Sequence, residues 1–178
     1  MATSMYSFSK LGIRPWLIKL CESIGFENPT EIQQKVIPEI VKGKNIIANA
    51  ETGSGKTAAF AFPILSKLSQ DPYGIFALII TPNRELAEQI NEQFKLFGKT
   101  LNLRSMCITG GQDIIKQRMA LDDLPHIIVG TPGRLFNQID ESEVFRKYLG
   151  NLSFLVFDEA DRLFEPTLKY FVDKIVAF

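Results

Sequence analysis

The chain has 178 residues, of which 46% are hydrophobic and 22% charged, and its 20 lysines and arginines equal its 20 aspartates and glutamates. This is enough for one domain with a sizeable core. The charge balance excludes a chain that is basic throughout, so a nucleic-acid partner would need a local basic patch. Cys21 and Cys107 fit no metal-binding spacing and indicate core thiols in a reducing compartment. No apolar run reaches the roughly 18 residues of a membrane span, and the first residues lack a signal-peptide pattern.

The amino-terminal part reads as two helices. Residues 1–7 are polar and are expected to be loose. Pro15 occupies a favoured early position of a first helix, which Gly25 should end. Thr30 is expected to cap a second helix, whose apolar stripe covers residues 32–41.

A glycine-rich octapeptide follows, Ala50-Glu51-Thr52-Gly53-Ser54-Gly55-Lys56-Thr57, which fits the P-loop template. We expect residues 45–49 to form a buried strand before it and a helix to follow it, which is the arrangement that the motif needs. The alternative is a glycine-rich turn with an incidental lysine.

The residue types of the octapeptide suit a polyphosphate. Gly53 and Gly55 allow backbone angles and close approaches that a Cβ would forbid. The loop amides can then bind phosphate oxygens at the positive end of the helix dipole. Lys56 would place its charge on the β- and γ-phosphates, and Thr57 would offer a hydroxyl to Mg²⁺.

Strands and helices alternate through the rest of the chain. Strands are expected at residues 76–80, 104–108, 126–129 and 154–157, and helices at 86–97, from 112 to about 121, at 134–139, and from either 160 or 166. This alternation predicts an α/β fold with a parallel sheet covered by helices on both faces. Ligands of such sheets bind at the carboxyl ends of the strands. His126, at a strand start, is interpreted as structural.

Acidic residues follow the last expected strand. In a P-loop protein, Asp158 at such a strand end would be the second Mg²⁺ anchor, through water. Glu159 could orient or deprotonate the attacking water, which favours hydrolysis. The alternative is that these acids only cap a helix.

With these motifs in place, the chain resembles the DEAD-box RNA helicases. The octapeptide and Asp158-Glu159-Ala160-Asp161 look like motifs I and II of that family. Further family motifs appear in order: Phe8, Gly25-Phe26, Pro29-Thr30 and Gln33 (the Q motif, within residues 8–33), Pro82-Asn83-Arg84-Glu85-Leu86-Ala87, Gly110-Gly111 and Thr131-Pro132-Gly133-Arg134. Asn83 stands where threonine is usual, and Glu51 where glutamine is common. The resemblance implies a RecA-like P-loop fold.

The resemblance also implies roles for these residues. ATP would contact Phe26, Gln33, Glu51, Thr52, Gly53, Ser54, Gly55, Lys56 and Thr57, with Mg²⁺ at Thr57 and Asp158, and catalysis would depend on Glu159, Asp158 and Lys56. RNA, held mainly by its sugar-phosphate backbone, would contact Pro82, Arg84, Gly110, Gly111, Thr131, Pro132 and Arg134.

Each role has a structural alternative. The Gln33 amide could pair with adenine and reject guanine while Phe26 stacks on the base. Otherwise Gln33 is a solvated helix residue and Phe26 a core residue. Similarly, Arg84 could be a surface charge, Gly110-Gly111 a turn, and Thr131-Pro132 a capped helix start.

The family has a second RecA-like domain with arginine fingers, and that domain and the Ser-Ala-Thr motif are not in this sequence. We therefore expect a monomeric amino-terminal helicase domain that binds nucleotide but does not unwind RNA alone. Residues 8–12, 14–17 and 71–76 look most like the nucleolar helicases of small-subunit ribosome assembly, which implies a role in the nucleus and nucleolus, with ribosome-assembly proteins as partners.

Two other functions use a P-loop. The first is a nucleotide-dependent switch that recruits partners and hydrolyses little. The second is a small-molecule kinase, which is disfavoured because Glu159 supplies a water-activating acid and no lid-like arginine cluster is evident.

Overall fold

The computed structural model describes residues 7–178, and the chain divides into two compact units, residues 1–71 and 72–178, which are described in turn. The predicted loose start at residues 1–7 lies outside the described residues, except for Ser7. The Ser7 hydroxyl oxygen accepts a hydrogen bond from the Ser9 N–H at 3.4 Å. Within residues 7–178, none of the helices has both the length and the apolar character needed to cross a membrane.

The first unit consists of helices. They are η1 (Phe8–Lys10), α1 (Pro15–Ser23), α2 (Glu31–Val41) and α3 (Lys56–Leu68). Local signals explain their ends: Pro15 is the first residue of α1, and Gly25, just after its end, has a φ of +80°. Thr30 is the N-cap of α2, as predicted, and its N–H donates to Gln33 Oε1 at 3.0 Å. The two predicted amino-terminal helices are therefore confirmed.

Aromatic and polar contacts join the amino-terminal segment to α3. The rings of Phe8 and Phe62 pack edge to face with centroids 5.9 Å apart, and both side chains are buried. The Arg14 N–H donates to Ser66 Oγ at 3.0 Å. The Trp16 indole N–H donates to Ser69 Oγ at 3.3 Å. These contacts hold α1 close to α3.

The predicted buried strand at residues 45–49 is wrong. The structure gives residues 44–50 no regular secondary structure, and the Ile47 side chain is fully exposed. An apolar run becomes a strand only where a neighbouring strand completes its backbone hydrogen bonds. The helix expected after the octapeptide is present as α3.

The second unit alternates strands with helices. Its elements are β1 (Ala77–Ile80), α4 (Arg84–Phe97), η2 (Lys99–Leu101), β2 (Ser105–Ile108), α5 (Ile114–Asp122), β3 (Ile127–Gly130), α6 (Pro132–Glu141), α7 (Glu143–Leu149), β4 (Phe154–Phe157), α8 (Ala160–Leu163) and α9 (Pro166–Val176). The strands expected in this part of the chain are confirmed within about one residue. Helix α7 was not predicted. The last expected helix is two helices, α8 and α9, separated by a turn before Pro166.

The sheet is parallel throughout, with the strand order β2-β3-β1-β4. Its register places Gly130 beside both Ile80 and Ile108, and Phe157 beside Ile80. All strands therefore end at one edge, and the residues that follow them gather there.

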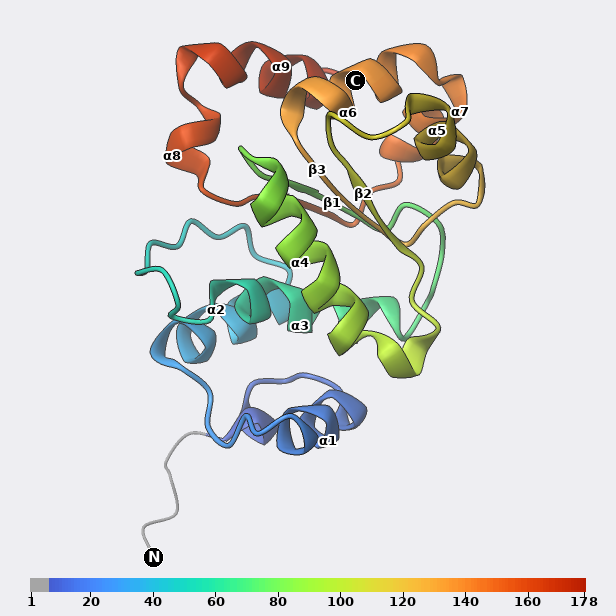
Figure 1. The fold of residues 1–178 in the computed structure, drawn as a ribbon. Coiled ribbons are helices and arrows are strands. Elements are labelled where there is room, and N and C mark those ends of the chain that lie inside the picture. Colours follow the sequence, from blue (N-terminus) through green and yellow to red (C-terminus); the bar gives the residue numbers. More distant parts are fainter. Residues whose placement is uncertain (1–6) are drawn as a thin grey trace, which may run out of the picture. The chain divides into compact units, whose positions relative to one another are not determined.

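Helices cover both faces of this sheet (Figure 1). Helix α4 packs against β2 and β3 and buries Ile90 and Phe94. On the opposite face, Leu78, Ile80 and Ile128 belong to one apolar cluster with residues of α6, α7 and α9, among them Leu135, Ile139, Phe145, Val172 and Ile175. This arrangement confirms the predicted α/β fold.

His126 and the two cysteines have structural roles. His126 Nδ1 accepts a hydrogen bond from the Arg104 N–H at 3.2 Å, and burial, with the nearby Arg104 charge, lowers the His126 pKa. Burial raises the pKa of Cys21 to about 12 and that of Cys107 to about 11. Both thiols are therefore protonated near neutral pH and unreactive.

Candidate functional site

The octapeptide forms a tight loop that ends at the start of α3. Gly53 has a φ of +82° and Gly55, the N-cap of α3, a φ of +89°, both in the left-handed region that favours glycine. A Cβ placed on Gly55 would lie 2.5 Å from Gln33 Nε2, whereas one on Gly53 would meet nothing within 4 Å. Gly55 is thus required for two reasons, its backbone angles and the close approach of Gln33.

Several polar groups of this loop suit an anion. No side chain caps the amino terminus of α3, so its first N–H groups remain available at the positive end of the helix dipole. Lys56 Nζ donates to the carbonyl oxygens of Ala50 at 2.6 Å and Glu51 at 2.9 Å, which places the ammonium group across the loop. The buried Ser54 Oγ has no hydrogen-bond partner among the described residues. A phosphate group would satisfy these donors.

Gln33 is held against the loop. Its side chain is only 3% exposed, so the alternative of a solvated helix residue is wrong. Oε1 accepts from the Thr30 N–H, and Nε2 donates to Gly55 O at 3.2 Å. The amide retains one N–H and one oxygen lone pair for a ligand. Phe26 remains 36% exposed, with its ring centroid 6.4 Å from that of Phe62, so it is not a core residue either.

In the second unit, the other predicted residues follow the strand ends. Along the sheet the order is Gly110-Gly111 after β2, Thr131 to Arg134 after β3, Pro82 to Arg84 after β1, and Asp158-Glu159 after β4. Backbone hydrogen bonds fix this alignment: the Thr131 N–H donates to Ile108 O at 3.1 Å, and the Asp158 N–H to Ile80 O at 2.9 Å.

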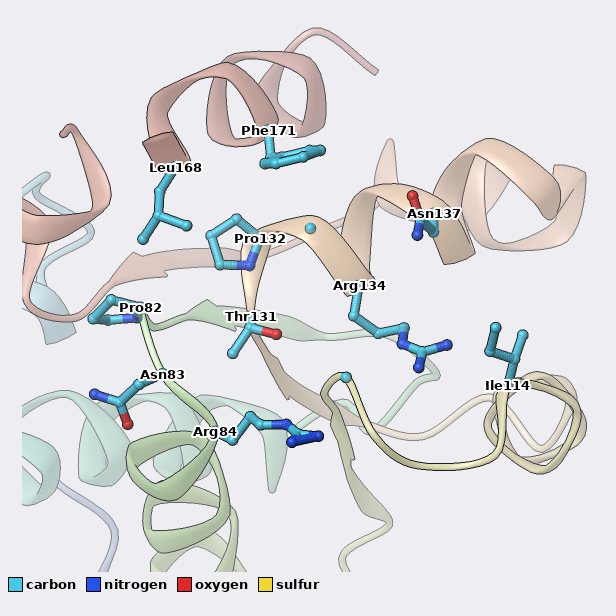
Figure 2. A pocket seen from close by; sticks show the side chains of 12 residues that line it. Pro82, Asn83, Arg84, Ile114, Thr131, Pro132, Arg134, Asn137, Leu168 and Phe171 are labelled. Carbon is cyan, nitrogen blue, oxygen red and sulfur yellow. The ribbon is translucent and has the colours of Figure 1, made fainter. Parts of the chain in front are cut away.

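A cavity of about 640 Å³ lies at this edge (Figure 2). It is lined by Pro82, Asn83, Arg84, Gly110, Ile114, Thr131, Pro132, Gly133, Arg134, Asn137, Leu168 and Phe171. None of these described lining residues is acidic, while two are arginines. The predicted RNA contacts thus share one cavity, except Gly111, which lies beside it: a Cβ on Gly111 would collide with the Arg84 guanidinium.

Hydrogen bonds hold the loop after β2 at the cavity. Arg134 Nη2 donates to Gln112 O at 3.2 Å. Gln117 Nε2 donates to Thr109 O at 3.1 Å and to Gln112 Oε1 at 2.9 Å. These bonds join α6 and α5 to the glycine-containing loop and so fix the distance between its backbone and Arg134.

Helix α6 points its amino terminus into the same cavity. Pro132 is its first residue and Thr131 its N-cap, as the capped-helix alternative expected, but the Thr131 hydroxyl makes no capping hydrogen bond. The first N–H groups of α6 are therefore open to a ligand, and an anion is favoured there. Asn83 instead caps α4, because its Oδ1 accepts from the Leu86 N–H at 2.9 Å.

Glu159 has an unusual backbone conformation, with φ of 51° and ψ of 52°. Non-glycine residues rarely adopt this left-handed region, and such strain clusters at functional sites. Glu159 is the N-cap residue of α8, as the capping alternative expected, but its side chain makes no capping hydrogen bond. Glu159 Oε2 is buried, lies 3.5 Å from Arg162 Nη1, and has no hydrogen-bond partner in the described chain.

The donor set for a metal ion is small. Within residues 7–178, the structure brings no three His, Cys, Asp or Glu side chains together as a metal cluster. Mg²⁺ commonly keeps several water ligands and binds through one or two protein oxygens plus phosphate oxygens. Thr57, in the first turn of α3, and Asp158, after β4, belong to different units and stay predicted Mg²⁺ ligands.

Six residues of the cavity were not predicted as RNA contacts, namely Asn83, Ile114, Gly133, Asn137, Leu168 and Phe171. The most distant are Leu168 and Phe171, which α9 brings to the site. Their spacing of three residues indicates one face of a helix. No local pattern indicates which strand end that face approaches.

Comparisons with known proteins show which family the chain resembles. The family model described as DEAD/DEAH box helicase matches residues 30–177. The chain is 54% identical over 162 residues to the ATP-dependent RNA helicase dbp8 of Schizosaccharomyces pombe, covering 90% of this chain and 36% of that protein. It is 44% identical over 170 residues to the ATP-dependent rRNA helicase rrp3 of the same organism, covering 96% of this chain and 36% of the relative. The chain thus spans about a third of the length of these relatives.

A solved structure is also similar. It is that of a DEAD box protein from the hyperthermophile Methanococcus jannaschii, with a TM-score of 0.84 and 37% sequence identity. The match covers 96% of this chain and 46% of that one. The RecA-like fold implied by the motifs is therefore confirmed.

Proposed function

Since the chain belongs to the DEAD/DEAH box helicase family, we propose that it binds ATP and, in the whole protein, couples ATP hydrolysis to RNA binding and local unwinding. The observation that carries this proposal is the acid-free cavity at the carboxyl ends of the strands, which collects most of the residues expected to contact RNA. The glycine loop and the uncapped amino terminus of α3 support the nucleotide part of the proposal.

In the nucleotide site, we assign phosphate binding to Lys56 and to the loop from Glu51 to Gly55. Lys56 would exchange its two carbonyl partners for phosphate oxygens, which are stronger acceptors because they are charged. Gln33 would use its remaining N–H and lone pair on the adenine edge, and the exposed Phe26 ring would stack on the base.

Hydrolysis requires an acid that handles the proton of water. Glu159 would orient the attacking water and accept its proton. Thr57 and Asp158 would anchor Mg²⁺, which supplies positive charge against the phosphates when bound. The strained backbone of Glu159 supports a positioned role for its carboxylate.

The cavity would bind the RNA backbone. Arg84, Arg134 and the open amides of α6 provide positive charge, and Gly110-Gly111 allows a close approach of the backbone. Phosphate contacts carry no sequence information, so we expect little sequence preference and a strong dependence on salt.

The test is ATP turnover with and without RNA, measured for the 178 residues and for the full-length gene product. Glu159→Gln should abolish turnover while ATP binding persists, because an amide cannot accept the proton. The exposed Glu165, at the start of α9, provides the control Glu165→Gln, which should turn over normally. Normal turnover by Glu159→Gln would refute its role. Nucleotide binding without RNA-stimulated turnover in the full-length wild type would favour the nucleotide-dependent switch.

We further propose that the RNA is ribosomal and that the protein works as a monomer in the nucleolus, with ribosome-assembly proteins as partners. The named rRNA helicase among the relatives supports this, as do residues 8–12, 14–17 and 71–76. Crosslinking of the protein to RNA in cells, followed by sequencing, tests the substrate. Crosslinks spread over messenger RNA without enrichment of ribosomal RNA would contradict it.

A further inference from the structure

One wall of the cavity has no part in the proposed phosphate contacts. Leu168 and Phe171 of α9 line it, and Figure 2 shows them on the opposite side of Pro132 from Arg84, Thr131 and Arg134. These apolar side chains add nothing to the binding of a phosphate group. Their presence in the same cavity indicates that the ligand also has an apolar part.

The size and charge of the cavity match a nucleotide. Its volume of about 640 Å³ lies within the roughly 300–1,000 Å³ typical of small-ligand pockets. The lining combines two arginines with apolar side chains and includes no acid among the described residues. A nucleotide has this combination of a charged phosphate and a flat apolar base.

The Phe171 ring is held in place. Its centroid lies 5.9 Å from that of Phe136 in α6 and 5.3 Å from that of Tyr170. A Cβ built on Gly133 would lie 3.9 Å from Phe171 Cε2, so the ring rests against the backbone of the first turn of α6. The ring is partly exposed toward the cavity. A fixed aromatic surface loses little entropy when a base stacks on it.

We propose that Phe171, assisted by Leu168, is a stacking platform for one base of single-stranded RNA whose phosphates contact Arg84 and Arg134. This inference rests on the proposed RNA-binding function and adds a base contact to it. Stacking is tolerant of sequence because every base has a π-face. The platform would therefore strengthen binding and favour unpaired bases without specifying a sequence.

The experiment compares two ligands of equal charge by fluorescence anisotropy: a labelled oligouridylate and an oligomer of the same length whose central nucleotides are abasic. The 178-residue chain is titrated as wild type, Phe171→Leu, Arg134→Gln and the control Val176→Ala. Val176 is on the same helix, is 57% exposed, and does not line the cavity. Urea unfolding midpoints establish that each variant is folded.

We expect Phe171→Leu to weaken binding of the intact RNA by about 5- to 100-fold, the range for loss of one base stack, and to leave the abasic ligand unchanged. Arg134→Gln should weaken binding of both ligands. It should also make the dependence of log affinity on log salt concentration less steep, by the amount expected for the loss of about one phosphate contact. Val176→Ala should resemble wild type. In Phe171→Trp, the intact RNA should bind at least as tightly as to wild type and quench the new indole fluorescence, whereas the abasic ligand should not quench it.

The outcomes separate the two proposals. Equal effects of Phe171→Leu on both ligands, or no effect on either, would overturn the stacking platform. If Arg134→Gln still weakens binding of both ligands in that case, the assignment of the cavity to the RNA backbone stands. If Arg134→Gln changes neither affinity, the RNA-binding assignment of the cavity itself is wrong. If Phe171→Leu fails to fold, the Phe171→Trp quenching result alone decides: no difference between the ligands overturns the platform.

Discussion

Replacing Gly55 with alanine should destabilise the chain more than the same replacement at Gly53. Both glycines have a φ above +80°, and an L-residue in the left-handed region costs about 1–2 kcal/mol. The two variants share this cost. They differ in their surroundings, because a new Cβ lies 2.5 Å from Gln33 Nε2 at position 55 and in open space at position 53.

The difference follows from the hydrogen bonds of Gln33. To make room, its amide must leave Gly55 O and the Thr30 N–H, which lie 3.2 and 3.0 Å away. Each such bond contributes about 0.5–1.5 kcal/mol net, and a buried group left without a partner costs about 1–3 kcal/mol. We therefore expect Gly55→Ala to lose about 1–3 kcal/mol more than Gly53→Ala.

The assay is urea unfolding, monitored by tryptophan fluorescence. Trp16 is the only tryptophan of the chain and belongs to the unit that contains the loop, where it donates to Ser69. With a slope of about 1–3 kcal/mol per M urea, an extra loss of 2 kcal/mol shifts the midpoint by about 1 M. Equal midpoints for the two variants would refute the reasoning. A double-mutant cycle adds a second check, since Gln33→Ala should abolish the excess cost of Gly55→Ala.

Three further predictions follow from single contacts. Gln33→Ala should reduce the preference for ATP over GTP by about 5- to 100-fold in competition binding, which corresponds to a loss of about 1–3 kcal/mol at the base edge. An unchanged preference would show that Gln33 does not contact the adenine. The His126 pKa is lowered in the folded state, so the unfolded chain binds the proton more readily and the free energy of unfolding falls as the pH drops below about 6.5. His126→Gln should remove this loss, which is measured as the change in the urea midpoint between pH 7.5 and 5.5. A variant that keeps the wild-type pH dependence would contradict the prediction. Gly111→Ala should displace the Arg84 guanidinium and weaken RNA binding, whereas Gly110→Ala, whose Cβ would lie 3.9 Å from Arg84 Nε, should have little effect. Equal RNA affinities of the two variants would show that the position of Arg84 does not matter for RNA binding.

The sequence alone determined the features that depend on near neighbours. Helix starts at Pro15 and Thr30 follow from local backbone and capping preferences, which a few adjacent residues satisfy. The backbone conformation of the loop glycines could be predicted because the motif requires backbone angles that glycine adopts readily. Once the strands were known to be parallel, their carboxyl ends had to share an edge, so the grouping of Arg84 with Arg134 could be predicted as well.

Some local signals were too weak to decide. Helix α7 has only seven residues and begins at Ser142, whose Oγ accepts from the Phe145 N–H at 3.2 Å. A serine followed by so short an apolar pattern is found in loops as well as at helix starts. Its helical state depends on burial of Phe145 and Leu149 in the core cluster beside the sheet.

Only the tertiary structure decided the features that depend on distant partners. Residues 45–49 have the composition of a buried strand, but an extended segment needs a neighbour for its backbone hydrogen bonds, and composition does not supply one. Gln33 looks like any exposed glutamine until the loop 22 residues later encloses its amide. Phe171 reads as one more apolar helix residue, and only the packing of α9 beside α6 brings its ring to the cavity, because side-chain contacts between elements depend on how those elements pack and not on the sequence near each residue.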